Sequence, residues 1–246
     1  MTLQGELEEQ GGWLFRHRSH LPLLLTPVFV AALLDPHFAQ GDRALTWVWA
    51  VICLLIAFAG LGVRAATVAF VPARTSGRNT ANQLAAQLNT TGMYSIVRHP
   101  LYVGNAIITA GATLFFRSWW LFAIVLLAFS LYYERIMLCE EAFLRQRFGQ
   151  TFEAWTARVP AIIPDIRLWQ APALSFSWRT MIRREYHGVV GILAAFAGFQ
   201  CLGELAVQRR LVLDPMSVSY AVVATLVFVV CRLLKKHTTV LRAQGR

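Results

Sequence analysis

The chain has 246 residues, of which 57% are hydrophobic and only 15% are charged, and its mean hydropathy is +0.50. An average soluble domain carries about 25% charged residues, so this chain has too few polar side chains to cover a surface that faces water. The composition therefore argues against a soluble globular enzyme, a disordered protein and a coiled coil. The net charge is +10, and the only lysines are Lys235 and Lys236. In an apolar chain such an excess indicates arginines that flank membrane spans rather than a nucleic-acid-binding surface.

Six apolar segments predict helices that cross or enter a membrane, since a spanning helix needs roughly 20 mostly apolar residues. The first segment contains Pro22 and Pro27, so it either spans with help from its flanks or is re-entrant. The third and fourth are separated only by Arg117, which predicts a tight helical hairpin. The expected fold is an all-α, polytopic integral membrane bundle of about six spans. In chain order the segments are Leu21–Leu34, Leu45–Val63, Leu101–Phe116, Ser118–Tyr133, His187–Val207 and Met216–Leu234.

Six spans would place both chain ends on one side of the membrane. The basic residues then divide unevenly, with 18 on one face and 4 on the other. Because positive charge favours the cytoplasmic side, we expect the amino terminus and both polar segments, Pro72–Pro100 and Glu134–Tyr186, in the cytoplasm. We divide the chain into amino-terminal spans with a linker (1–90), a core (91–170) and two further spans (171–246).

Two further sequence features, the cysteines and a glycine pattern, could suggest a binding site, but their surroundings in the sequence argue against one. The four cysteines form no CxxC pair and three of them lie in apolar runs, so we predict free thiols and neither a disulfide framework nor a metal site. The segment Gly60–Ala65 matches a dinucleotide-binding pattern, but it lies inside an apolar helix with no strand before it. We therefore interpret it as a helix-packing segment.

The first candidate site is the segment around Arg98, His99 and Pro100. Proline suits the first position of a helix, because its missing N–H costs nothing there. Arg98 and His99 are therefore expected at the mouth of the first hairpin arm, with Tyr102 and Gly104 on its first turns. An arginine, a histidine and a helix amino terminus together favour an anion such as a carboxylate or a phosphate. The alternative is an interfacial Arg-His pair that reaches toward lipid headgroups.

The second candidate site is the pair Glu140 and Glu141, on a helix that is expected to continue out of the membrane from the second hairpin arm. Neighbouring helical residues point about 100° apart, so these carboxylates are not expected to act as a symmetrical pair on one ligand atom. One would face a pocket while the other pairs with Arg145 or Arg135. The alternative is a solvated helix with ordinary pairs such as Glu141–Arg145. Gly149 is the expected end of this helix.

The hairpin connects the two candidate sites. A hairpin returns to the side of the membrane that it left, and its arms are neighbours because only one residue joins them. The sequence therefore predicts that Arg98 and His99 meet Glu140 and Glu141 at the membrane surface. A zwitterionic ligand would fit between these opposite charges.

Together these residues resemble the isoprenylcysteine carboxyl methyltransferase and phospholipid methyltransferase superfamily, in its bacterial lipid-modifying branch. The resemblance extends from Thr91 to Pro164. Members of this superfamily are integral membrane enzymes that use S-adenosylmethionine, and the two motifs help to form their cofactor pocket. The residues that carry the resemblance are Arg98, His99, Pro100, Leu101, Tyr102, Val103, Gly104, Glu140, Glu141, Leu144, Phe148, Gly149, Phe152, Trp155, Val159 and Pro160.

The resemblance implies a reaction and roles for individual residues. The expected reaction transfers a methyl group to a membrane-lipid headgroup, either a phosphate such as that of lipid A or an amine, at the cytoplasmic face of a bacterial inner membrane. An anionic acceptor needs no strong base, whereas an amine would need one, for which His99 or a glutamate is the candidate. Arg98, His99 and Glu141 are the implied catalytic residues. The implied cofactor-binding residues are His99, Tyr102, Gly104, Glu140 and Glu141.

Three other functions stay open at this stage. They are carboxyl O-methylation of an isoprenylated cysteine, an NADPH-dependent reduction like that of the membrane sterol reductases, and a non-catalytic membrane scaffold. The expected partners are a membrane-lipid substrate and the bilayer, and no nucleic acid. The last two spans, His187–Val207 and Met216–Leu234, depart from the isoprenylcysteine enzymes. They either wall a lateral entrance for lipid or form the contact of a homo-oligomer.

Overall fold

The computed structural model describes residues 2–18, 20–34, 43–72, 85–210 and 213–241. Every regular element in these ranges is a helix, which confirms the all-α prediction. In chain order, with η for 3-10 helices, the elements are α1 (Leu3–His17), η1 (Leu21–Leu25), α2 (Thr26–Leu33), α4 (Arg43–Val68), η2 (Gly92–Ser95), α5 (Pro100–Leu114), α6 (Trp119–Phe148), α7 (Gln150–Thr156), η3 (Ile166–Leu168), α8 (Trp178–Gln208) and α9 (Pro215–His237).

The described part of the chain contains four helices that are long and apolar enough to cross a membrane, which supports the predicted polytopic membrane bundle. The two other predicted spans form shorter helices. The first is divided between η1 and α2, with Pro27 in the first turn of α2, where its missing N–H costs no helical hydrogen bond. The second is α5, which has 15 residues. The four long spans are Thr46–Val68, Trp119–Phe148, Trp178–Ala206 and Pro215–His237.

Large apolar side chains stay exposed along the outside of the long helices. Leu55 on α4 and Leu127 on α6 are each 62% exposed, and Leu226 on α9 is 58% exposed. A water-soluble protein rarely leaves such a continuous apolar surface uncovered. These faces are suited to contact with lipid acyl chains, so the protein is an integral membrane protein.

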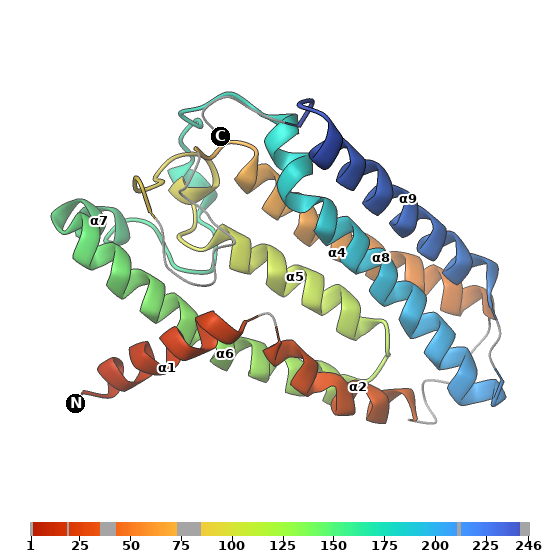
Figure 1. Ribbon diagram of the computed structural model, residues 1–246. Helices are drawn as coiled ribbons and strands as arrows, with labels where there is room; N and C mark the ends of the chain where they lie inside the picture. Colours follow the sequence, from red (N-terminus) through yellow and green to blue (C-terminus); the bar gives the residue numbers. More distant parts are fainter. Residues whose placement is uncertain (1, 19, 35–42, 73–84, 211–212, 242–246) are drawn as a thin grey trace.

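Helices α4, α5, α6, α8 and α9 lie along one main direction, and α1 crosses it at an angle (Figure 1). α4 packs on α5, α8 packs on both α4 and α9, and α1 packs on α6. α7 and the segments 85–99 and 157–177 gather at one end, and we call residues 85–99 and 149–177 the cap. α1 begins and α9 ends at this cap end of the bundle (Figure 1). The first and the last described helix thus have their outer ends at the same end of the bundle, and the side of the membrane that this end faces stays a prediction.

The helical hairpin is present where the sequence predicts it. α5 begins at Pro100, and a short link, 115–118, leads into α6. α6 continues for 30 residues and ends at Phe148. Gly149 follows with a φ of +50°, a backbone conformation that favours glycine. α6 therefore carries Glu140 and Glu141 beyond its apolar run toward the cap.

Two apolar cores hold the molecule together. The larger core takes buried side chains from α2, α4, α6 and α8, and it includes Phe116 and Phe196. The smaller core lies inside the cap and is built around Phe152, Trp155 and Val159. These three residues belong to the part of the sequence that carries the family resemblance, so that part also forms the support of the cap.

Candidate functional site

The structure brings the basic and the acidic motif together at the cap end. Nη1 of Arg98 lies 2.8 Å from Oε1 of Glu141 and donates a hydrogen bond of 2.9 Å to Oε2. His99 donates from Nε2 to Oε1 of the same carboxylate, also at 2.9 Å. His99 is 7% exposed, so this contact is largely shielded from solvent. The predicted meeting of the two motifs is therefore confirmed.

The second carboxylate of the pair has different neighbours. Tyr102 donates its hydroxyl hydrogen to Oε2 of Glu140 at 2.9 Å, and Nδ1 of His99 lies 3.8 Å from the same oxygen. The ring of Tyr133 lies 4.8 Å from the ring of Tyr102, measured between centroids. The two glutamates thus hold different groups, as their angular separation on the helix predicts. We call Arg98, His99, Tyr102, Glu140 and Glu141 the charged cluster.

The predicted pairing of one glutamate with Arg145 or Arg135 is wrong, and the alternative, an exposed Glu141–Arg145 pair, does not form either. Nε of Arg145 donates to Glu153 at 2.6 Å rather than to Glu141. Arg135 donates to Gln10 of α1 at 3.0 Å. Neither arginine is thus the hydrogen-bonding partner of Glu141, because Arg98 and His99 hold that carboxylate from the other hairpin arm.

The cap fixes the backbone of the basic motif. The N–H of Arg98 donates to the carbonyl oxygen of Pro160 at 2.8 Å, and the N–H of His99 donates to that of Ala161 at 3.2 Å. The chain just before Pro160 is anchored by Phe152 and Val159 in the cap core. Packing of the cap therefore helps to position the backbone that carries the guanidinium and the imidazole.

Tyr94 lies in the cap beneath the charged cluster. Its backbone oxygen accepts a hydrogen bond from Nε1 of Trp155 at 3.1 Å. Burial, together with the negative charge of Glu140, raises the pKa of the Tyr94 phenol. Both effects act in the same direction, because each disfavours the charged form of the phenol.

Gly104, one of the predicted site residues, faces the neighbouring helix α4. A Cβ atom at this position would lie 2.5 Å from Cγ of Arg64 and 2.8 Å from the carbonyl oxygen of Gly60. The same close approach explains Gly60, so the helix-packing interpretation is confirmed for this glycine, whereas a Cβ atom at Gly62 would meet no atom within 4 Å. Gly104 thus gives the Arg64 side chain room to cross α5, and its expected contact with a cofactor stays a prediction.

Four residues next to the charged cluster were not among the predicted site residues. Arg64 pairs with Glu185 through two contacts of 2.9 Å. Nη1 of Arg64 donates to Oδ1 of Asn105 at 2.7 Å, and Nδ2 of Asn105 donates to the hydroxyl of Tyr133 at 2.9 Å. Arg64 and Glu185 are 121 positions apart, so no local pattern could have predicted their contact.

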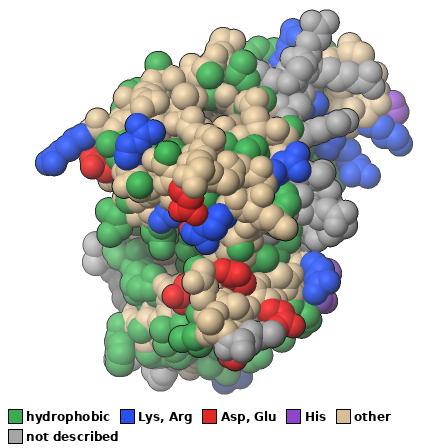
Figure 2. All heavy atoms as spheres, turned by 90° about the vertical axis from the view of Figure 1, so that its left-hand side faces the viewer, with side chains coloured by type: hydrophobic (Ala, Val, Ile, Leu, Met, Phe, Trp, Pro, Cys, Tyr) green, Lys and Arg blue, Asp and Glu red, His purple; other side chains and the backbone are tan. Residues whose placement is uncertain are grey.

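The surface at the cap end mixes charges of both signs. Figure 2 looks onto this end and shows basic and acidic side chains next to one another among apolar and polar groups. On the cap, an open pocket of about 480 Å³ is lined by residues that include Ser95, Trp155, Arg158 and Arg167. The cap therefore has a pocket with charged and aromatic side chains in addition to the charged cluster.

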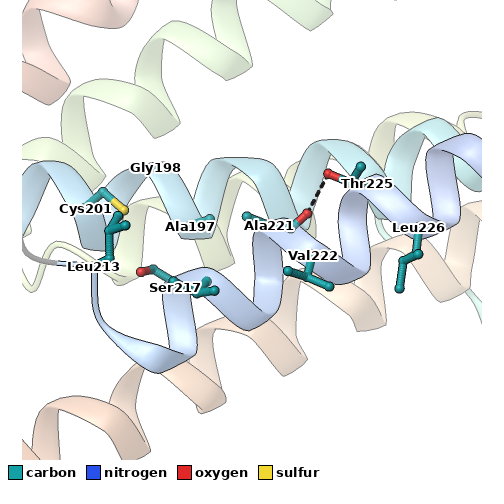
Figure 3. A pocket seen from close by; sticks show the side chains of 10 residues that line it. Ala197, Gly198, Cys201, Leu213, Ser217, Ala221, Val222, Thr225 and Leu226 are labelled. Atoms are coloured by element: carbon teal, nitrogen blue, oxygen red, sulfur yellow. Dashed lines mark hydrogen bonds between the residues drawn. The ribbon is translucent and has the colours of Figure 1, made fainter.

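A separate groove of about 500 Å³ lies between α8 and α9 (Figure 3). Its lining is mostly apolar and includes Gly198, Ser217 and Ala221, and Thr225 donates a hydrogen bond to the backbone oxygen of Ala221. Glu185, near the start of α8, does not line this groove. The groove offers space for an apolar group and contributes no charge to the charged cluster.

Comparison with known proteins adds independent information. The family model of phospholipid methyltransferases matches residues 46–151. The chain is 34% identical over 161 residues to the nickel-cobalt-cadmium resistance protein NccN of Alcaligenes xylosoxydans xylosoxydans, covering 65% of this chain and 70% of that protein. It is also 34% identical over 160 residues to the cobalt-zinc-cadmium resistance protein CzcN of Cupriavidus metallidurans, covering 64% and 68% respectively.

A further relative links the chain to the carboxyl methyltransferases. It is the protein-S-isoprenylcysteine O-methyltransferase of Schizosaccharomyces pombe, 39% identical over 82 residues, or 32% of this chain and 34% of that protein. No solved structure matches the chain significantly. The phospholipid methyltransferase match contains every residue of the charged cluster. The chain therefore belongs to the isoprenylcysteine carboxyl methyltransferase and phospholipid methyltransferase superfamily of membrane methyltransferases.

Proposed function

We propose that this protein is an S-adenosylmethionine-dependent methyltransferase that modifies a lipid headgroup at the cytoplasmic face of a bacterial inner membrane. The observation that carries the proposal is the charged cluster, in which a guanidinium, an imidazole, two carboxylates and a phenol meet at the cap end. These groups come from two arms of one membrane hairpin, so a ligand bound there lies next to the bilayer. A lipid headgroup can reach such a site without leaving its membrane.

The chemistry of the cluster fits the cofactor. S-adenosylmethionine has a carboxylate that suits Arg98 and an ammonium group that suits Glu140 or Glu141. The faces of Tyr102 and Tyr133 suit a sulfonium cation. Nε of Arg98 is buried and has no hydrogen-bond partner among the described residues. Buried polar atoms are usually satisfied, so this N–H is available to a ligand.

The residues of the cluster would bind and orient more than they would react. When bound, S-adenosylmethionine supplies a methyl group on a sulfonium, which an anionic acceptor can take without a strong base. Arg98 and Glu141 neutralise each other before binding, and each can exchange its partner for a ligand group of opposite charge. His99 holds a proton at Nε2 against Glu141 and would accept one only from an amine acceptor. Holding donor and acceptor in register supplies much of the rate.

The proposed acceptor is a membrane lipid, with a phosphate favoured over an amine. Arg158 and Arg167 line the cap pocket, and arginine binds phosphate with two parallel hydrogen bonds. The names of NccN and CzcN describe resistance to metal cations. Methylation of a lipid phosphate would remove negative charge from the membrane surface, which is one way in which a methyltransferase could serve such resistance. Growth of a deletion strain on nickel, cobalt and cadmium tests that link.

Isoprenylcysteine carboxyl methylation is the second candidate, because the Schizosaccharomyces pombe relative carries that activity in its name. The deciding experiment combines two measurements. Lipid mass spectrometry of cells with and without the gene should show one lipid class shifted by a methyl group, and purified protein should transfer labelled methyl groups to that class. Transfer to a farnesylcysteine analogue instead would support the second candidate. Thermal stabilisation by NADPH but not by S-adenosylhomocysteine would reject methyl transfer in favour of a reductase.

A further inference from the structure

An ion pair connects α8 to the helices that build the charged cluster. Glu185 lies on α8, outside residues 46–151 that match the phospholipid methyltransferase family, and it is only 5% exposed. Its two oxygens accept hydrogen bonds from Nε and Nη2 of Arg64 on α4, both at 2.9 Å. A pair with two parallel hydrogen bonds fixes the plane of the guanidinium. Glu185 thus holds Arg64 in one orientation.

Arg64 in turn fixes the direction of an amide on α5. Nη1 of Arg64 donates to Oδ1 of Asn105 at 2.7 Å, so the oxygen of this amide faces α4 and its nitrogen faces α6. That nitrogen donates to the hydroxyl of Tyr133 at 2.9 Å. Because this hydroxyl accepts from Asn105, its own hydrogen points elsewhere. The ion pair therefore acts through Asn105 on the hydroxyl of Tyr133, while the Tyr133 ring packs on Phe129 and Tyr132.

The chain of contacts ends in the charged cluster. The rings of Tyr133 and Tyr102 have centroids 4.8 Å apart, and Tyr102 donates to Glu140. A continuous path therefore leads from Glu185 through Arg64, Asn105 and the two tyrosines to a carboxylate of the cluster. It joins α8, α4, α5 and α6 at one level of the bundle.

Stability alone does not account for an ion pair at this position. Replacing a buried ion pair by apolar side chains of similar size is often neutral or stabilising, because the desolvation cost of the charges disappears. An apolar pair could hold α4 and α8 together equally well. It could not orient the amide of Asn105, since that requires a hydrogen-bond donor directed at Oδ1.

We propose that Glu185 and Arg64 are positioning residues of the methyltransferase site, which makes α8 part of that site although it lies outside the family match. The proposal rests on the proposed function. Through Asn105, the ion pair holds the rings of Tyr133 and Tyr102 in the arrangement that receives the sulfonium end of S-adenosylmethionine. Neither Glu185 nor Arg64 needs to touch the ligand.

The test separates ligand affinity from stability in the full-length protein. S-adenosylhomocysteine affinity and the thermal midpoint are measured for wild type and four variants. Glu185→Gln and Asn105→Ala should each weaken affinity about tenfold, since each breaks a hydrogen bond of the path. The double variant Arg64→Met with Glu185→Leu should keep the wild-type midpoint but not the wild-type affinity. Glu204→Gln, the same change near the other end of α8, should alter neither.

Two outcomes would overturn the proposal. If the double variant has both the wild-type midpoint and the wild-type affinity, the ion pair only holds the helices together. If Asn105→Ala binds S-adenosylhomocysteine as wild type does, the path does not position the tyrosines, whatever happens to the Glu185→Gln variant. Wild-type protein that fails to bind S-adenosylhomocysteine would instead reject the proposed function, and this proposal with it.

Discussion

Arg98 and Glu141 are 43 positions apart in the chain, and Nη1 of Arg98 lies 2.8 Å from Oε1 of Glu141. The two residues stand on opposite arms of a hairpin, at the end where both arms reach the cap. Their side chains are 19% and 16% exposed, so the pair is shielded from solvent but open to exchange. A ligand with a carboxylate and an ammonium group can replace each partner of the pair by one of its own charges.

The first prediction concerns this pair. Arg98→Gln and Glu141→Gln should each weaken binding of S-adenosylhomocysteine by about tenfold or more, because each removes one charge-assisted hydrogen bond to the ligand and leaves a partly buried opposite charge. Titration calorimetry in detergent measures the affinity. Arg145→Gln is the matched control, since Arg145 pairs with the exposed Glu153 and an exposed pair contributes about 0–1 kcal/mol to stability. Equal losses in all three variants would contradict a ligand-binding role for the pair.

The second prediction isolates one hydroxyl. Tyr102→Phe keeps the aromatic ring and removes only the donor to Glu140. A hydrogen bond to a charged group is worth about 1.5–3 kcal/mol, so the affinity for S-adenosylhomocysteine should fall about tenfold or more. Tyr220→Phe on α9 removes a hydroxyl outside the cluster and should leave the affinity at the wild-type value. An unchanged affinity for Tyr102→Phe would mean that ligand binding does not depend on the hydrogen bond from Tyr102 to Glu140.

The third prediction compares two glycines on adjacent helices. Gly104→Ala places a Cβ atom 2.5 Å from Cγ of Arg64 and 2.8 Å from a backbone oxygen, and such overpacking costs about 1–3 kcal/mol. Gly62→Ala meets no atom within 4 Å and should be neutral or slightly stabilising, because alanine favours the helix. Thermal unfolding of the two purified variants gives the comparison. Equal midpoints would show that α4 and α5 do not pack this closely.

The fourth prediction tests whether the cap supports the cluster. Phe152→Ala removes a fully buried ring from the cap core and should cost about 3–5 kcal/mol of stability. S-adenosylhomocysteine affinity should fall too, since the cap holds the backbone of Arg98 and His99. Ile163→Ala changes a side chain that is 81% exposed and should leave unfolding unchanged. A Phe152→Ala protein with full affinity would show that the cluster is held without the cap core.

Local chemistry explains what could be predicted from the sequence. Pro100 predicts the start of α5 because proline suits the first helical position, and Gly149 predicts the end of α6 because it adopts a positive φ. A single residue between two apolar runs predicts the hairpin, and the hairpin predicts that Arg98 and Glu141 meet. Each of these inferences needs information from one short segment of the chain.

Other features depend on distant parts of the chain and could not be predicted in this way. Arg64 directly follows the predicted span Leu45–Val63, and the sequence around it gives no sign of its partners Asn105 and Glu185, which lie on other helices. The sequence of α8 alone does not predict that Glu185 faces the interior of the bundle, because that orientation depends on the packing of α8 against α4. The long helices also extend beyond the apolar segments from which they were predicted. For example, α8 begins at Trp178, whereas the predicted span begins at His187. These added turns are polar and carry the ion pair.

The short link 115–118 also has a consequence for biogenesis. Because only a short link joins α5 to α6, we expect the two helices to enter the membrane as one hairpin, which brings Arg98 and Glu141 there together. α4 precedes this hairpin in the chain, so Arg64 reaches the membrane before Glu185, the carboxylate with which it pairs. Glu185 emerges only with α8. Because domains acquire structure as they are synthesised, the nascent protein has both motifs in place before the charge beside them is balanced, and insertion of α8 completes the assembly.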